Sequence, residues 1–183
     1  MRRIIIVMIG VLWANALSAK TFELKSPSGE IRITVDIGEQ ISYSVYGNGK
    51  PLLIDNALAL CLRDATLGEK PHLTGHKTSP INRTFRPAVA FKYNEIHDRC
   101  NMLRLDFRGG WAVEFRAYDD GMAYRFVTAF GNDVEVLGEK FAIRFPGDYT
   151  AVLQQPGGFR TAYEEPYSIV ETDSWKPGDP MSV

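Results

Sequence analysis

The sequence predicts an all-β protein built as an antiparallel sandwich, on three observations. Apolar and polar residues alternate in several short segments, most clearly at residues 31–37 and 111–117. Residues that favour tight turns, such as those at 47–49 and 119–121, separate these segments. After residue 20 no window of eleven or more residues carries a helical stripe, so strands joined by turns favour a sandwich or barrel over a βαβ fold.

The first half of the chain is expected to form four short strands. The turn at residues 26–29 precedes the strand at 31–37, and a second alternating strand follows at 41–45. Beyond the turn at 47–49, the apolar stretches 51–54 and 57–62 are expected to be two separate strands.

The second half begins with a polar stretch at residues 63–87, broken by glycines and prolines, which predicts a long irregular excursion with or without one short strand. Residues 103–127 are expected to form a three-stranded antiparallel meander. A further strand is expected at 141–145. Residues 171–183 show no alternation and are typical of a domain boundary or a chain cut short.

The N-terminus has the features of a secretory signal peptide. Two arginines follow Met1, an apolar stretch covers residues 4–13, and small residues lead to a cleavage site expected after Ala19. The alternative is a membrane anchor, but a spanning helix needs about 20 apolar residues. We therefore expect an exported protein, periplasmic or secreted, with a signal peptide at 1–19, a sandwich domain at 20–175 and a linker or truncated end at 176–183.

Composition limits the function further. The chain has 183 residues with 21 Lys+Arg and 22 Asp+Glu, and no basic stripe, so nucleic acid is not an expected partner. No second long apolar run is present, so no membrane span is expected. The two cysteines, Cys61 and Cys100, could form one disulfide in an oxidising compartment or remain buried free thiols.

An ordered series of segments resembles the N-terminal domain of glycoside hydrolase family 97. The most specific segment is residues 115–126, FRAYDDGMAYRF, which resembles a hairpin of that domain. Residues 26–31 look like its opening strand, and residues 41–45 with 49–53 look like its next hairpin. Residues 163–167, YEEPY, are similar to the segment after a Pro-rich turn.

The resemblance covers roughly residues 22 to 175 and carries several implications. It implies a β-super-sandwich of the galactose-mutarotase-like kind, which packs on a (β/α)₈ barrel in exo-acting α-glucosidases and α-galactosidases. The barrel carries the catalytic carboxylates, so no catalytic residue is assigned to this chain. A calcium ion belongs to the family's active site, but its ligand from this domain is expected beyond Val183, so no metal ligand is assigned here.

Four residues are candidates for contact with substrate or with a neighbouring domain: Tyr163, Glu164, Glu165 and Tyr167. Glycine and proline at 156–158 place them on an irregular loop, where functional residues concentrate. Aromatic rings stack on sugars and carboxylates accept hydrogen bonds from sugar hydroxyls. The alternative is a solvated acidic loop.

Other polar groups favour structural explanations. Asp119 and Asp120 could be an acid/base pair, but beside Gly121 they are more typical of a β-turn. Arg116 and Arg125 flank that turn and could pair with its acids, so a structural role is favoured over sugar binding. The spacing of His72 and His76 would suit zinc only on a helix or with further ligands, so no metal site is expected.

These observations lead to one main hypothesis and two alternatives. The main one is a non-catalytic accessory domain of a secreted α-glycosidase, whose partners are a catalytic barrel, in cis or in trans, and an α-linked oligosaccharide. The first alternative is a stand-alone carbohydrate-binding module. The second is a structural secreted sandwich that binds a protein partner. Docking on a barrel or a protein predicts exposed apolar residues at the interface.

Overall fold

The computed structural model describes residues 20–90, 92–154, 160 and 166–174, and the predicted signal peptide and terminal tail lie outside these residues. Nearly all described residues with regular structure lie in strands, and a single 3₁₀ turn, η1, covers Thr172–Ser174. The strands are β1 (Lys20–Lys25), β2 (Ile31–Ile37), β3 (Ile41–Gly47), β4 (Lys50–Leu62), β5 (Thr66–Leu67), β6 (Leu73–Phe85), β7 (Ile96–Phe107), β8 (Trp111–Tyr118), β9 (Gly121–Thr128), β10 (Val136–Phe141), β11 (Thr150–Leu153) and β12 (Ser168–Glu171).

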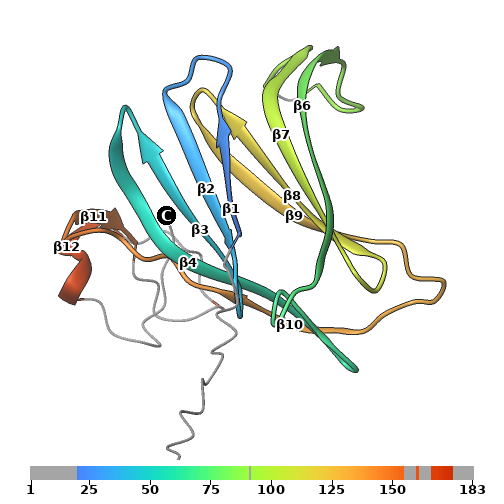
Figure 1. Ribbon diagram of the computed structural model, residues 1–183. Helices are drawn as coiled ribbons and strands as arrows, with labels where there is room; N and C mark the ends of the chain where they lie inside the picture. The colour runs from blue at the N-terminus through green and yellow to red at the C-terminus, as the bar shows by residue number, and fades with distance from the viewer. Residues whose placement is uncertain (1–19, 91, 155–159, 161–165, 175–183) are drawn as a thin grey trace, which may run out of the picture.

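The strands form antiparallel sheets, which confirms the predicted fold class. A six-stranded sheet has the order β1-β2-β3-β4-β10, with β5 paired to β4, and a four-stranded sheet has the order β6-β7-β8-β9. The hairpin β11-β12 forms a small sheet of its own. Figure 1 shows the two large sheets facing each other, with β11 and β12 beyond the β4 side.

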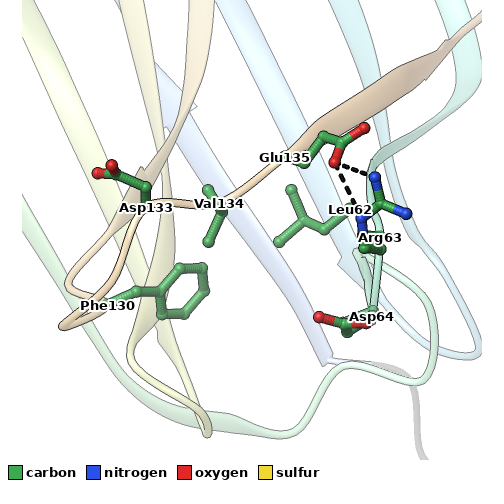
Figure 2. A pocket seen from close by; sticks show the side chains of 8 residues that line it. Leu62, Arg63, Asp64, Phe130, Asp133, Val134 and Glu135 are labelled. Carbon is green, nitrogen blue, oxygen red and sulfur yellow. Dashed lines mark hydrogen bonds and ion pairs between the residues drawn. The ribbon is translucent and has the colours of Figure 1, made fainter.

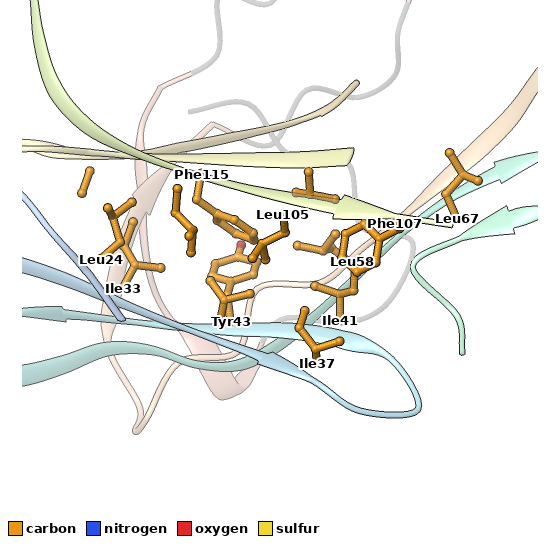
Figure 3. Close-up of a cluster of buried hydrophobic side chains, with 14 of the residues drawn as sticks. Leu24, Ile33, Ile37, Ile41, Tyr43, Leu58, Leu67, Leu105, Phe107 and Phe115 are labelled. Atoms are coloured by element: carbon orange, nitrogen blue, oxygen red, sulfur yellow. The ribbon is translucent and has the colours of Figure 1, made fainter. Parts of the chain in front are cut away.

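The core lies between the two large sheets. Ile33, Tyr43 and Leu58 enter it from the six-stranded sheet, and Leu105 and Phe115 enter it from the other (Figure 3). Each of these side chains is at most 3% exposed. Burying one large apolar side chain contributes about 1.5–3 kcal/mol, so the alternation seen in the sequence is what holds the sheets together.

The predicted turns are confirmed where positive φ is required. Asn48 and Gly49 have φ of 50° and 78° between β3 and β4, as a two-residue hairpin turn needs. Gly109 and Gly110 have φ of 97° and 78° between β7 and β8. These local signals fix two of the hairpins that bring the strands into register.

The prediction of an irregular excursion at residues 63–87 is wrong. Thirteen of those residues form β6, which pairs along its length with β7. Because β6 is an edge strand with no buried residue, its sequence lacks the apolar alternation that reveals the others. Pro80 lies within β6 and has no N–H to donate. An edge strand tolerates this because it pairs with a neighbouring strand on one side only.

Two further boundaries differ from the expectation. The stretches 51–54 and 57–62 form the single strand β4, which changes register against β3 and places Asp55 at φ 49°. The later strand β10 ends at Phe141, so Ile143 and Phe145 lie outside it and are 49% and 45% exposed.

Asn56 joins β4 to the segment after β10. Its side chain is 1% exposed, and its amide Nδ2 donates to the carbonyl of Tyr43 at 3.3 Å. Its Oδ1 accepts the backbone N–H of Arg144, and the N–H of Ile54 donates to the Arg144 carbonyl at 3.0 Å. The change of register in β4 therefore places a buried amide where it holds a segment 88 residues away.

Candidate functional site

The structure describes one of the four predicted contact residues. Tyr163, Glu164 and Glu165 lie outside the described residues. Tyr167 immediately precedes β12 and is 64% exposed. An exposed aromatic ring at this position is available for contact.

The cysteines and histidines have structural surroundings. Cys61 lies on β4 and Cys100 on β7, in different sheets, and both are free thiols rather than a disulfide. Burial raises the pKa of the Cys100 thiol. The ring of His76 contacts that of Phe22, and His72 Nε2 lies 3.2 Å from Arg108. The described residues contain no group of three or more His, Cys, Asp or Glu side chains placed to hold one metal ion.

The acids of the β8–β9 hairpin form a turn, as expected. Tyr118 pairs with Gly121 across Asp119 and Asp120, and Asp119 accepts the backbone N–H of Ser28 at 2.7 Å. That bond is the main cause of the lowered pKa of Asp119. The turn thus ties the hairpin to the loop before β2.

Arg116 and Arg125 form ion pairs, but with other acids than those of the turn. Arg116 faces Asp98 and Arg125 faces Glu114, both on the outer side of the four-stranded sheet. The reason is register, because Arg125 lies directly opposite Glu114 and away from the turn. We call this outer side the charged face; its residues are Arg83, Asp98, Arg104, Asp106, Glu114, Arg116, Tyr118 and Arg125.

Asp98 is the centre of the first half of the charged face. It is only 8% exposed and accepts from Arg83 Nε at 2.8 Å, and from the Tyr118 hydroxyl at 3.1 Å. Arg116 approaches the same carboxylate at 3.4 Å. Burial alone would raise the pKa of Asp98, but these hydrogen bonds and charges outweigh it and hold the pKa below its usual value.

Glu114 is the centre of the second half. Its side chain is 6% exposed and lies between Arg104 and Arg125, which donate to it at 2.9 and 2.7 Å. Here too burial would raise the pKa, and the two guanidinium groups lower it on balance. Because each buried carboxylate has at least two cationic partners, the charged face is a satisfied network.

A shallow pocket of about 250 Å³ lies on the charged face. Its walls include Arg83, Arg116, Arg125, Tyr118 and Glu114. Arg116 is 20% exposed, and the hydrogen bonds of its guanidinium, to Asp98 and to Tyr118 at 3.3 Å, both involve one nitrogen. The remaining N–H groups can therefore serve a polar ligand.

A second pocket, of about 390 Å³, lies at the end of the sandwich beside β4 and the segment that leads from β9 to β10. Figure 2 shows Asp64 and Asp133 on opposite sides of it, and Arg63 paired with Glu135. The carboxylates of Asp64, Asp133 and Glu135 are exposed at this pocket.

Large apolar residues are exposed mainly after residue 133. Phe141, Val152 and Ile169 are 58%, 58% and 74% exposed. We call the following residues the C-terminal apolar set: Val134, Val136, Leu137, Phe141, Ile143, Phe145, Tyr149, Val152, Tyr167 and Ile169. They lie on β10–β12 and the segments around them, where the sandwich core does not cover them.

The sequence had shown only part of this arrangement. Alternation within β8 predicted that Glu114 and Arg116 share the polar side of the strand. It did not identify Asp98 or Arg104, because which cation meets which acid depends on the register between β7, β8 and β9. Predicting the register of β7, β8 and β9 would have shown which acids lie opposite which arginines.

Fold and site together define an all-β sandwich domain with a paired charged face and an unusual share of exposed apolar residues near its end. The chain belongs to the glycosyl-hydrolase 97 N-terminal family, whose model matches residues 24–181. The predicted resemblance is therefore confirmed. Within the described residues there is no helix long and apolar enough to cross a membrane.

Relatives are glycoside hydrolases. A retaining alpha-galactosidase of Bacteroides thetaiotaomicron is 33% identical over 153 residues, which are 82% of this chain and 23% of that protein. A probable retaining alpha-galactosidase of Streptomyces bingchenggensis is 29% identical over 160 residues, 85% of this chain and 24% of that protein. The chain thus spans about a quarter of the length of these curated relatives.

Solved structures show the same fold. A beta-arabinopyranosidase matches with a TM-score of 0.69 and 26% identity over 80% of this chain and 26% of its own. A glycoside hydrolase family 97 enzyme from Pseudoalteromonas sp. strain K8, in complex with acarbose, matches with a TM-score of 0.68 and 22% identity over 81% of this chain and 24% of its own. The second match supports the fold alone.

Proposed function

We propose that this chain acts as a non-catalytic N-terminal accessory domain of an exported α-glycosidase. In this role it packs against a separate catalytic (β/α)₈ barrel and helps to wall the barrel's sugar pocket. Hydrolysis itself is the work of the barrel, which supplies the paired carboxylates.

The observation that carries the proposal is the combination of family and coverage. The chain is 33% identical to a retaining alpha-galactosidase, yet it matches only 23% of that protein, through a family defined by its N-terminal position. A domain with this relationship is expected to work beside the remaining three quarters of such an enzyme. Both curated relatives favour an α-galactoside over an α-glucoside as the substrate.

The surface supports a role in packing. The C-terminal apolar set includes side chains such as Phe141 and Ile169 that are more than half exposed. Contact with a second domain would remove this apolar surface from water. Each Å² that is buried would contribute about 25 cal/mol to the free energy of association. The predicted loop residues Tyr163, Glu164 and Glu165, together with Tyr167, would contribute to the same interface or to the rim of the sugar pocket.

Calcium and export complete the proposal. Calcium would be bound by the assembled enzyme, with most of its ligands from the barrel. The basic and apolar N-terminus would direct the protein to the periplasm or outside the cell.

An enzyme assay tests whether this chain alone hydrolyses glycosides. The purified chain is incubated with an aryl α-galactoside and an aryl α-glucoside, with calcium or with a chelator, and the B. thetaiotaomicron relative serves as the positive control. We expect release of the aryl group by the relative only. Calcium-dependent turnover by the purified chain would overturn the proposal.

The carbohydrate-binding alternative has one observation in its favour, the pocket on the charged face. Its guanidinium, phenol and carboxylate groups are suited to a small polar ligand, and its volume of about 250 Å³ is of that scale. Titration calorimetry of the chain with galactose and maltooligosaccharides distinguishes the two functions. The accessory function predicts little or no heat; binding that disappears in Arg116→Gln would favour the alternative.

A further inference from the structure

The edges of the two large sheets are not equally protected. Edge strands usually carry charges, proline or irregular pairing, which prevent further strands from joining. β6 has Pro80, and β1 begins and ends with Lys20 and Lys25. β10 includes Lys140 and changes register against β4.

β9 is the exception. It has eight residues, no proline and continuous register with β8. Its one charged residue, Arg125, donates to Glu114 on β8 at 2.7 Å, which holds part of the guanidinium toward β8. Within the described chain, β9 pairs with β8 only.

The register identifies the backbone groups left free on this edge. The N–H of Ala129 donates to the carbonyl of Gly110 at 2.8 Å, and the residues of β8 and β9 pair one by one from there to the turn. In an antiparallel ladder the bonding direction alternates from residue to residue. The N–H groups directed away from β8 are therefore those of Met122, Tyr124, Phe126 and Thr128.

The core is also open on this side. β1 packs against β7 and β8, and β2 packs against β8 and β9, so β4 and β10 lie opposite the space beyond β9. There Val136 and Phe141 are 55% and 58% exposed. A hydrogen bond of 2.6 Å from the Tyr124 hydroxyl to Glu139 joins β9 to β10 across this opening.

We propose that the free edge of β9 is where a further β-strand joins the four-stranded sheet. Its core-facing side chains are apolar and cover Phe126, Val136 and Phe141. Its outward side chain opposite Arg125 is acidic, because opposite charges across a strand pair stabilise it. This places a fifth strand opposite β4 and β10 and continues the existing core.

The added strand comes from polypeptide equivalent to the part of the curated relatives that this chain does not match, about three quarters of their length. A second copy of this chain fits poorly. Antiparallel pairing of β9 with itself, centred on Arg125, would set two guanidinium groups against each other, which is destabilising. This inference depends on the fold, so glycosidase assays do not decide it.

Hydrogen exchange measured by NMR on the purified chain tests the free edge. The amides of Met122, Tyr124, Phe126 and Thr128 should exchange at least about 100-fold faster than those of Ala123, Arg125 and Val127, which bond to β8. Slow exchange of all seven amides in the monomeric chain would overturn the proposal.

A synthetic peptide then tests whether the edge accepts a strand. The probe is a nine-residue peptide that alternates valine and threonine, with one glutamate at its centre. At millimolar concentration it should slow the four edge amides by about tenfold or more, as strand addition does. A peptide with lysine in place of glutamate should bind several-fold more weakly, and one N-methylated at alternate residues should give no protection.

A variant of the protein provides the matched control. Thr128→Pro removes one outward N–H without removing a bond to β8, whereas Thr128→Ser keeps it, and thermal melting verifies that both fold. Peptide protection should fall several-fold in the proline variant only. Equal protection by the N-methylated peptide, or none by any peptide, would contradict the proposal.

Discussion

The charged face and the C-terminal apolar set differ in how they leave side chains to solvent. On the charged face, Asp98 and Glu114 are nearly buried, and each is surrounded by cationic partners on neighbouring strands. In the C-terminal apolar set, side chains such as Phe141 and Ile169 are mostly exposed and lack an apolar layer over them.

The difference shows which part of the domain is complete in itself. A buried charge is costly unless it is paired, so its partners must be present in the same chain. An exposed apolar side chain costs less free energy than an unpaired buried charge, so it can remain exposed in the isolated domain. The charged face therefore contributes to the stability of the isolated domain, whereas the apolar set is available for a neighbouring structure.

The largest expected effect is on the charged face. Glu114→Gln removes the charge between Arg104 and Arg125 and should lower the free energy of unfolding by about 2–3 kcal/mol, since breaking a buried pair is strongly destabilising. Urea unfolding measures it. In the control Glu135→Gln the pair with Arg63 is exposed, and a loss of at most about 1 kcal/mol is expected. Equal losses in the two variants would remove the distinction.

Acid should act on the charged face next. The folded pKa values of Asp98 and Glu114 are lowered, so their contribution is fully present above their unfolded pKa values, near 4. It is lost as the pH falls from there through the lower folded values, because the unfolded state then binds more protons. Urea midpoints measured from pH 6 down to pH 2 should fall by less in Glu114→Gln than in the unaltered chain.

The smallest effect on stability is expected in the C-terminal apolar set. Phe141→Ser should change the free energy of unfolding of the isolated chain by no more than about 0.5–1 kcal/mol, because the ring is 58% exposed. Self-association measured by sedimentation, and binding of a hydrophobic dye, should decrease. The control Thr150→Ser should change neither quantity. A loss like that of Glu114→Gln would show that the ring is part of the core.

Fold class could be predicted from the sequence because the core strands have one buried side. β2 and β8 alternate clearly, and the turns at Asn48 and Gly109 require positive φ. β6 escaped prediction because an edge strand with exposed residues on both sides has no such pattern. The break expected in β4 failed for a different reason, since one strand continues through a change of register that the sequence does not mark.

The site was less predictable than the fold. Alternation identified the polar side of β8, but pairing among Asp98, Glu114 and the four arginines follows from register across four strands. The candidate contact residues Tyr163, Glu164, Glu165 and Tyr167 were identified through the family resemblance. Of these four, the structure describes Tyr167.

The buried amide of Asn56 has a consequence for how the exposed segment after β10 is held. It binds the carbonyl of Tyr43 and the N–H of Arg144, so it joins early and late parts of the chain. The N–H of Ile54 and the side chain of Asp55 on β4 also bind Arg144, so the segment is fastened to the strand at three adjacent residues. Replacing Asn56 would therefore loosen the anchoring of the exposed Ile143 and Phe145 on either side of Arg144.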